Sequence, residues 1–118
     1  MAKPPKYSQA ELLEHIIERC DRIAKQLEGR TFEDVERDID LLDATAYRLQ
    51  AIGEACGKLD DAITEAYDLP WRSIIGMRHI LSHDYLAMSV TIVWKAATES
   101  IGDLREVCRQ ALDKEQDE

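Results

Sequence analysis

Residues 8–29 read SQAELLEHIIERCDRIAKQLEG, and this stretch carries the signals of a complete amphipathic helix. Ser8 and Glu11 have the spacing of a capping box, which satisfies backbone N–H groups at a helix N-terminus. Apolar residues then recur every three or four positions, which is the period of one helical face. They are Leu13, Ile16, Cys20, Ile23 and Leu27. Gly29 follows as a C-terminal stop, so the stretch predicts one long helix with a single buried side.

Two further helices are expected after this one. Thr31 and Asp34 can cap a short acidic helix that ends near residue 37. The next expected helix is long, and its apolar stripe runs through Leu42, Ala46, Leu49, Ile52, Cys56, Leu59 and Ile63. Gly53 and Gly57 lie inside this pattern. Since each glycine costs about 1 kcal/mol relative to Ala in a helix, close helix–helix packing is a reason to keep them there.

The chain after Leu69 predicts two more helices. Pro70 is suited to the first turn of a helix, which we expect to run to about His83. Residues 84–88 have the composition of a loop, and Ser89 or Thr91 can cap the last helix. Its apolar stripe consists of Val93, Ala97, Ile101, Leu104, Cys108 and Ala111 or Leu112.

These helices predict an all-α fold, an antiparallel bundle of four or five helices. No segment alternates polar and apolar residues with the period of a strand, and 118 residues suffice for one domain. We expect a disordered N-terminal tail over residues 1–7, a helical domain over 8–112 and a charged C-terminal tail over 113–118.

The charge balance limits the classes of function. With 15 Lys and Arg against 24 Asp and Glu, the net charge is −9. This argues against DNA binding over a broad surface, because phosphate binding needs clustered cations, but it leaves room for a small cationic site. No apolar run is long enough to cross a membrane, and no leader is visible. Three widely spaced cysteines on apolar stripes indicate buried, reduced thiols and a cytoplasmic protein.

The fourth expected helix concentrates groups that can do chemistry. On a helical wheel of about 100° per residue, Arg78 falls on the apolar side with Trp71 and Ile74. An isolated buried guanidinium is very costly, so Arg78 must meet an acidic partner, reach a wet cleft or face a second subunit. The same wheel groups Arg72, His79 and His83 about 100–140° away from Arg78.

Histidine and arginine together are sufficient for RNA cleavage without a metal. An imidazole can take the proton from a ribose 2′-OH, and a guanidinium can stabilise charge on the phosphoryl oxygens. Two alternatives stay open at this point. Such residues are commonly solvated or paired on a surface helix, and the i, i+4 spacing of His79 and His83 also permits a metal pair.

Residues 70–94, PWRSIIGMRHILSHDYLAMSVTIVW, closely resemble the HEPN superfamily, specifically its HepT-like toxin branch. That branch carries an Arg-x4-His-x-Tyr motif, which here falls on Arg78, His83 and Tyr85. Residues 51–55, AIGEA, match the signature of the family's third helix, and the resemblance covers roughly residues 8–112.

The resemblance implies a HEPN bundle that forms a homodimer with a shared cationic cleft. Arg78 and His83 would be the catalytic pair of an endoribonuclease that acts on RNA with no cofactor and no metal. Arg78 would contact phosphate, His83 would handle the proton, and His79 could assist. The partner would be an antitoxin, a nucleotidyltransferase of the MNT type, which silences such toxins by transferring AMP to the motif tyrosine, here Tyr85.

Three further residues are candidates for a role in the site, and two other functions stay open. Glu54 could orient Arg78 or His83, or be a plain structural carboxylate, and Asp84 could hold one tautomer of His83. Arg72 is a candidate phosphate-binding residue. The chain could instead be a non-catalytic helical dimer that serves as partner and substrate of a nucleotidyltransferase, or a nucleotide-binding module that uses Arg72, Arg78 and His83.

Overall fold

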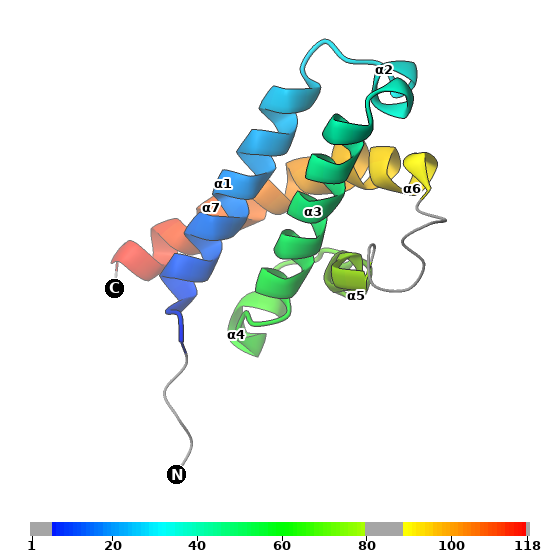
Figure 1. Cartoon of the computed structure of the whole chain (residues 1–118). Helices are drawn as coiled ribbons and strands as arrows, with labels where there is room; N and C mark the ends of the chain where they lie inside the picture. Colours follow the sequence, from blue (N-terminus) through cyan, green and yellow to red (C-terminus); the bar gives the residue numbers. More distant parts are fainter. Residues whose placement is uncertain (1–5, 80–88, 118) are drawn as a thin grey trace.

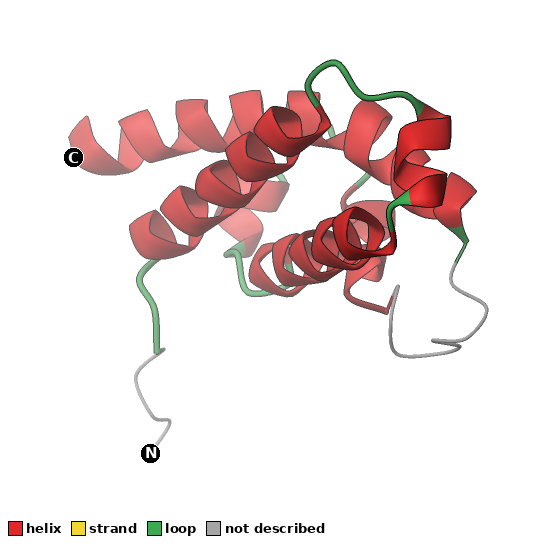
Figure 2. Ribbon diagram, turned by 45° about the horizontal axis from the view of Figure 1, so that its top comes forward, coloured by secondary structure: helices red, strands yellow, loops and turns green. Residues whose placement is uncertain are grey.

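The computed structural model describes residues 6–79 and 89–117, and these residues form an all-α bundle without strands. Its two long N-terminal helices, α1 (Gln9–Leu27) and α3 (Ile39–Cys56), run antiparallel and side by side (Figure 1). The C-terminal helix α7 (Ile101–Asp117) packs along α1. Short helices fill the connections: α2 (Phe32–Arg37), α4 (Asp61–Thr64), α5 (Trp71–Gly76) and α6 (Val90–Lys95). Figure 2 shows the same arrangement from a second direction. The predicted all-α fold class is confirmed.

Capping residues begin several helices where the sequence predicts. Ser8 Oγ accepts a hydrogen bond from Glu11 N at 3.0 Å, and the Glu11 carboxylate accepts one from Ser8 N at 3.2 Å. Thr31 and Asp34 form the same reciprocal box at the start of α2, and Ser89 caps α6 through Ile92 N. These contacts satisfy N–H groups that a helix leaves unpaired at its N-terminus.

The core is aliphatic and includes the three cysteines. The apolar stripes of α1, α3 and α7 face one another, and the largest fully buried side chains include Leu13, Ile16, Ile23, Leu49, Ile52 and Leu104. Cys20, Cys56 and Cys108 are free thiols in this core, as predicted. Burial raises the pKa of both Cys20 and Cys108 to about 12, and it also raises the pKa of Cys56.

The predicted third helix is too long, because α3 ends at Cys56. Gly57 N bonds to Gly53 O at 3.1 Å, and a turn follows before the single turn of α4. Gln9, at the start of α1, holds this turn: its Oε1 accepts from Asp60 N at 2.8 Å and its Nε2 donates to Lys58 O at 3.4 Å. Leu59 and Ile63 are still buried, as their place in the stripe predicts.

The last predicted helix is interrupted and longer than expected. A π-helical segment, η3 (Ala96–Ser100), joins α6 to α7, and α7 continues to Asp117, so residues 113–117 extend this helix. The expected loop over residues 84–88 and most of the expected N-terminal tail lie outside the described residues. Among the helices that the structure describes, none has the length and apolar composition to span a membrane.

Candidate functional site

The candidate site is built on α5 and the 3-10 turn η1 (Met77–His79), which follows it directly. Ile74 and Met77 are 2% and 7% exposed, and they anchor this segment in the core. At its start, Trp71 Nε1 donates a hydrogen bond to Tyr67 O at 3.0 Å. Both ends of α5 are therefore fixed before the chain reaches Arg78.

Gly53 sets how closely this segment approaches α3. A Cβ atom at Gly53 would lie 2.5 Å from Arg78 N, 3.0 Å from Ile75 O and 3.1 Å from Ile74 O. No side chain fits there, because the neighbours are backbone atoms that cannot rotate aside. The close packing predicted for Gly53 is confirmed, and its function is to seat the backbone of Arg78 directly on α3. At Gly57 the nearest atom would lie 3.4 Å away, which is ordinary contact.

Arg78 is exposed in the single chain. The helical wheel predicts that it lies on the apolar stripe, and this prediction is wrong within one chain. The reason is the change to a 3-10 turn after Gly76, where the chain advances about 120° per residue instead of 100°. Met77 takes the buried position instead. The guanidinium is thus open to solvent, to a ligand or to a second subunit.

Arg78 and His79 form a direct pair. Arg78 Nε donates a hydrogen bond to His79 Nε2 at 3.0 Å, although the wheel predicts that their side chains point apart. The long arginine stem accounts for the difference, since it can bend back to its neighbour. A neutral imidazole that accepts through Nε2 carries its proton on Nδ1. Arg78 is exposed although its Nε is engaged by His79, and Arg72 is also exposed on this segment.

The other predicted residues are distributed differently. Glu54 is exposed and lines a groove of about 550 Å³ between α1 and α3, together with His15. Within the described residues no ion pair joins Glu54 to Arg78. His83, Asp84 and Tyr85 lie outside the described residues, so their predicted roles stay predictions. The described residues also contain no group of three His, Cys, Asp or Glu side chains placed to hold a metal ion.

A groove of about 300 Å³ adjoins the site. It lies between α5 and the segment from α6 to η3, and its lining is Pro70, Ser73, Ile74, Gly76, Met77, Ile92, Lys95, Ala96 and Ser100. Ile92 is 61% exposed there. Trp94 on the same helix packs edge-on against Phe32, with ring centroids 6.2 Å apart, so it is a packing residue.

The comparisons with known proteins identify the family. The family model described as "Ribonuclease HepT-like" matches residues 14–111. The chain belongs to the HepT-like ribonuclease family. Membership places it in the HEPN superfamily and makes it an RNase at the level of the family, as the resemblance in residues 70–94 predicted.

Relatives that are similar in sequence carry ribonuclease names. A protein of Caldanaerobacter subterraneus subsp. tengcongensis named "Putative RNase" is 34% identical over 87% of this chain and 93% of its own length. A "Probable ribonuclease HepT" of Thermococcus cleftensis is 31% identical over 85% of this chain and 92% of its own length. No solved structure is similar enough to count as a match.

Proposed function

We propose that this HepT-like chain is the toxin of a toxin–antitoxin pair, an endoribonuclease that cleaves RNA without a metal. One observation carries the proposal: the exposed Arg78–His79 pair, whose backbone is seated against Gly53. A cation that is fixed in position and open to solvent can bind the phosphate group of a phosphodiester. A preorganised donor of this kind stabilises the negative charge that develops on the phosphoryl oxygens in the transition state.

In the proposed reaction, His83 accepts the proton of a ribose 2′-OH. The 2′-oxygen attacks the adjacent phosphorus, and the bond to the 5′-oxygen of the next nucleotide breaks. The leaving oxygen takes up a proton, so the products are a 2′,3′-cyclic phosphate and a 5′-hydroxyl end. Arg78 stabilises the charged phosphoryl oxygens through its Nη donors, His79 orients Arg78, and Arg72 binds a neighbouring phosphate. A cellular RNA substrate would be met in the cytoplasm, which is the location we propose.

RNA cleavage in EDTA tests this proposal. We expect wild type to cleave RNA and to leave 2′,3′-cyclic phosphate ends, and we expect Arg78→Ala and His83→Ala to lower the rate by about 10²–10³-fold or more. Arg37→Ala, an exposed arginine on α2, is the matched control and should cleave normally. Cleavage that needs added metal, or that survives both site substitutions, would disprove the proposal.

We also propose that the active form is a homodimer with the Arg78 segments near its axis. The groove beside α5 supports this, since the exposed Ile92 is an apolar side chain that a second copy would cover. Two copies would also gather two sets of Arg72 and Arg78, which offsets locally the charge of −9 on each chain.

The proposed antitoxin is a nucleotidyltransferase of the MNT type that attaches AMP to Tyr85. Family membership and the position of Tyr85 two residues after His83 support this. Co-expression with such an enzyme should add the mass of AMP to wild type and restore growth. Tyr85→Phe should take up no AMP and should stay toxic. Unchanged AMP incorporation in Tyr85→Phe would place the modification elsewhere.

A further inference from the structure

A lysine lines the groove that adjoins the Arg78 segment. This groove of about 300 Å³ lies between α5 and the segment from α6 to η3. Among the described residues that line it, Lys95 is the only charged one, and it is exposed. Ser73 and Ser100 add two hydroxyl groups to the lining. The ammonium group and both hydroxyls can donate hydrogen bonds to an anion.

The π-helical turn η3 keeps a carboxylate out of this groove. In a regular α-helix, Glu99 at i+4 would be a neighbour of Lys95 on the helix surface. The i to i+5 hydrogen-bond pattern of η3 adds one residue to this turn. As a result Ser100 lines the groove and Glu99 does not. Within the described residues no ion pair joins Lys95 to an acidic side chain.

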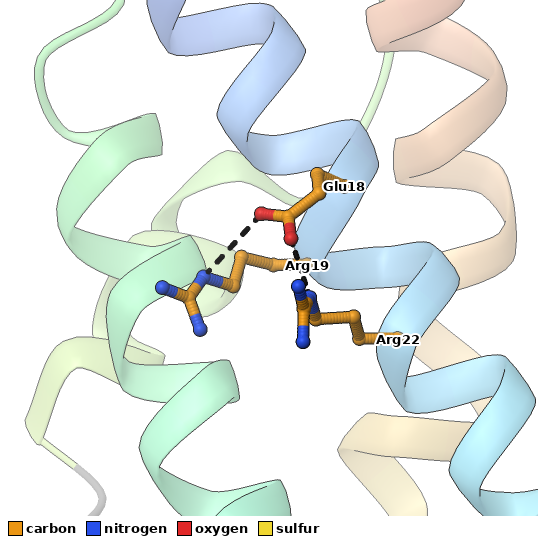
Figure 3. A network of polar contacts seen from close by, with 3 residues as sticks. All are labelled: Glu18, Arg19 and Arg22. Carbon is orange, nitrogen blue, oxygen red and sulfur yellow. Dashed lines mark hydrogen bonds and ion pairs between the residues drawn. The ribbon is translucent and has the colours of Figure 1, made fainter.

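The two larger grooves differ because carboxylates line them. The groove of about 720 Å³ along α1 contains Glu14, Glu18 and Asp21, and the groove of about 550 Å³ between α1 and α3 contains four glutamates. Some of their cations already bind inside the chain: Figure 3 shows Glu18 bonded to Arg22 and 3.9 Å from Arg19 Nε. Carboxylates repel a polyanion, and the groove beside α5 is the one of these three whose described lining contains none.

Gly76 leaves open space at this groove. It is exposed, and no atom lies within 4 Å of the place where its Cβ would be. Met77, which also lines the groove, directly precedes Arg78. An RNA strand that lies in the groove would thus have Arg78 beside it on one element and Lys95 on the other.

We propose that Lys95 binds an RNA phosphate beyond the one that is cleaved, with Ser73 and Ser100 as further donors. This inference rests on the proposed ribonuclease function and adds a substrate-binding residue to it. Lys95 takes no part in the proton transfers and only holds the strand. A second copy that contacts Ile92 would lie next to Lys95, three residues later on α6, so the strand would run along the edge of the proposed dimer contact.

Binding of an RNA that cannot be cleaved tests the inference apart from the reaction. The probe is a short fluorescent single strand with 2′-O-methyl groups, and its anisotropy is measured from low to high salt. Lys95→Ala should weaken binding about three- to tenfold at low salt. It should also lower the slope of log affinity against log salt by about 0.7, the value for one phosphate contact on a single strand. Lys95→Arg should restore both.

Substrate length gives an independent measurement in the cleavage reaction. A dinucleotide contains only the phosphate that is cleaved, whereas a longer strand supplies further phosphates. Lys95→Ala should lower kcat/KM about three- to tenfold for the longer strand, mainly through KM, and less for the dinucleotide. Lys114→Ala is the matched control, because Lys114 is an exposed lysine in the last turn of α7 and does not line the groove. It should behave as wild type does.

Gly76 offers a second test of the charge in the groove. Gly76→Glu and Gly76→Gln add side chains of the same size to open space, and the two variants differ by one negative charge. The backbone of Gly76 does not lie in the left-handed region, so both side chains are tolerated. The Glu variant should bind the RNA probe at least about threefold more weakly than the Gln variant at low salt. The difference should disappear at high salt, since salt screens exposed charges.

The outcomes separate this inference from the proposed function. A wild type that binds the probe through Lys95 but cleaves no RNA would overturn the cleavage mechanism and leave the role of Lys95 in RNA binding. Cleavage by wild type, with unchanged affinity and salt dependence in Lys95→Ala, would overturn the inference and leave the mechanism. Equal binding by the two Gly76 variants at low salt would also overturn the inference. A wild type that binds no RNA would overturn both.

Discussion

Gly53 is the residue on which the geometry of the site depends most directly. Its missing side chain lets the backbone of residues 74–78 rest on α3, with Arg78 N only 2.5 Å from where a Cβ atom would be. The sequence predicted close packing at this glycine from its place in an apolar helical stripe. It did not reveal which segment would occupy the space, because that segment is separated from Gly53 by more than twenty residues.

We therefore predict that Gly53→Ala destabilises the protein and lowers RNA cleavage. The added methyl group must displace backbone, and overpacking of this kind costs about 1–3 kcal/mol. Because α5 and η1 must move away from α3, Arg78 is displaced as well. Chemical denaturation gives the stability, and the cleavage rate measured well below the unfolding midpoint gives the effect on the site.

Gly102 provides the matched control. It lies in α7 with no atom within 4 Å of its virtual Cβ, so Gly102→Ala adds helix propensity without a clash. It should stabilise the protein by up to about 1 kcal/mol and leave cleavage unchanged. If both alanines behaved alike, the close contact at Gly53 would have no special importance.

At the scale of elements, the three long helices meet around the cysteines. Cys20 comes from α1, Cys56 from α3 and Cys108 from α7, and all three thiols are buried. Loss of hydration on burial raises the pKa of Cys20 and of Cys108 from 9.0 to about 12. The same burial keeps reagents away, because the thiolate is the reactive form and the sulfur atoms lack solvent contact.

This arrangement predicts protected thiols and a loss of stability in alkali. Native protein at neutral pH should resist alkylation, while the unfolded chain should react at all three cysteines. Above pH 9 the unfolded thiols ionise but the folded ones do not, so the unfolded state gains free energy of ionisation. The contribution of the thiols to the free energy of unfolding should therefore be constant through neutral pH. It should fall between about pH 9 and pH 12.

A variant with all three cysteines replaced by alanine isolates the contribution of the thiols. Its stability should be lower throughout, because the side chains are smaller, but it should fall less steeply from pH 9 upward. An equally steep fall would assign the alkaline effect to other groups. Rapid alkylation of the native wild type would contradict the burial of the thiols.

At the scale of the whole molecule, the described chain measures 46 × 32 × 22 Å and leaves a few large apolar side chains exposed. Two of them are isoleucines with nearly equal exposure, Ile39 at 63% and Ile92 at 61%. Only Ile92 lines the groove beside α5, next to the segment that carries Arg78. This difference allows the proposed dimer to be tested with matched substitutions.

Ile92→Lys should shift the protein from dimer to monomer and reduce cleavage, because it places a charge in the proposed interface. Ile39→Lys should leave both unchanged. Sedimentation equilibrium measures the mass against that of the 13.5 kDa chain. A wild-type protein that is monomeric at high concentration, or a dimer that survives Ile92→Lys, would contradict this interface.

The sequence by itself determined where several helices begin, their caps, most of their buried faces and the family. Capping boxes, apolar periodicity and the Arg-x4-His-x-Tyr spacing are local patterns. Each relates residues that lie within one or two helical turns of one another. For that reason the helix starts at Ser8, Thr31 and Ser89, and the burial of all three cysteines, agree with the prediction.

Only the tertiary structure decided features that join distant parts of the chain. The end of α3 at Cys56 is held by Gln9, about fifty residues away, and the exposure of Arg78 follows from the seating of Met77 in the core. The close approach of Arg78 N to Gly53 likewise exists only once η1 has packed against α3. A sequence pattern records the period of one helix, whereas these features depend on which helix packs against which.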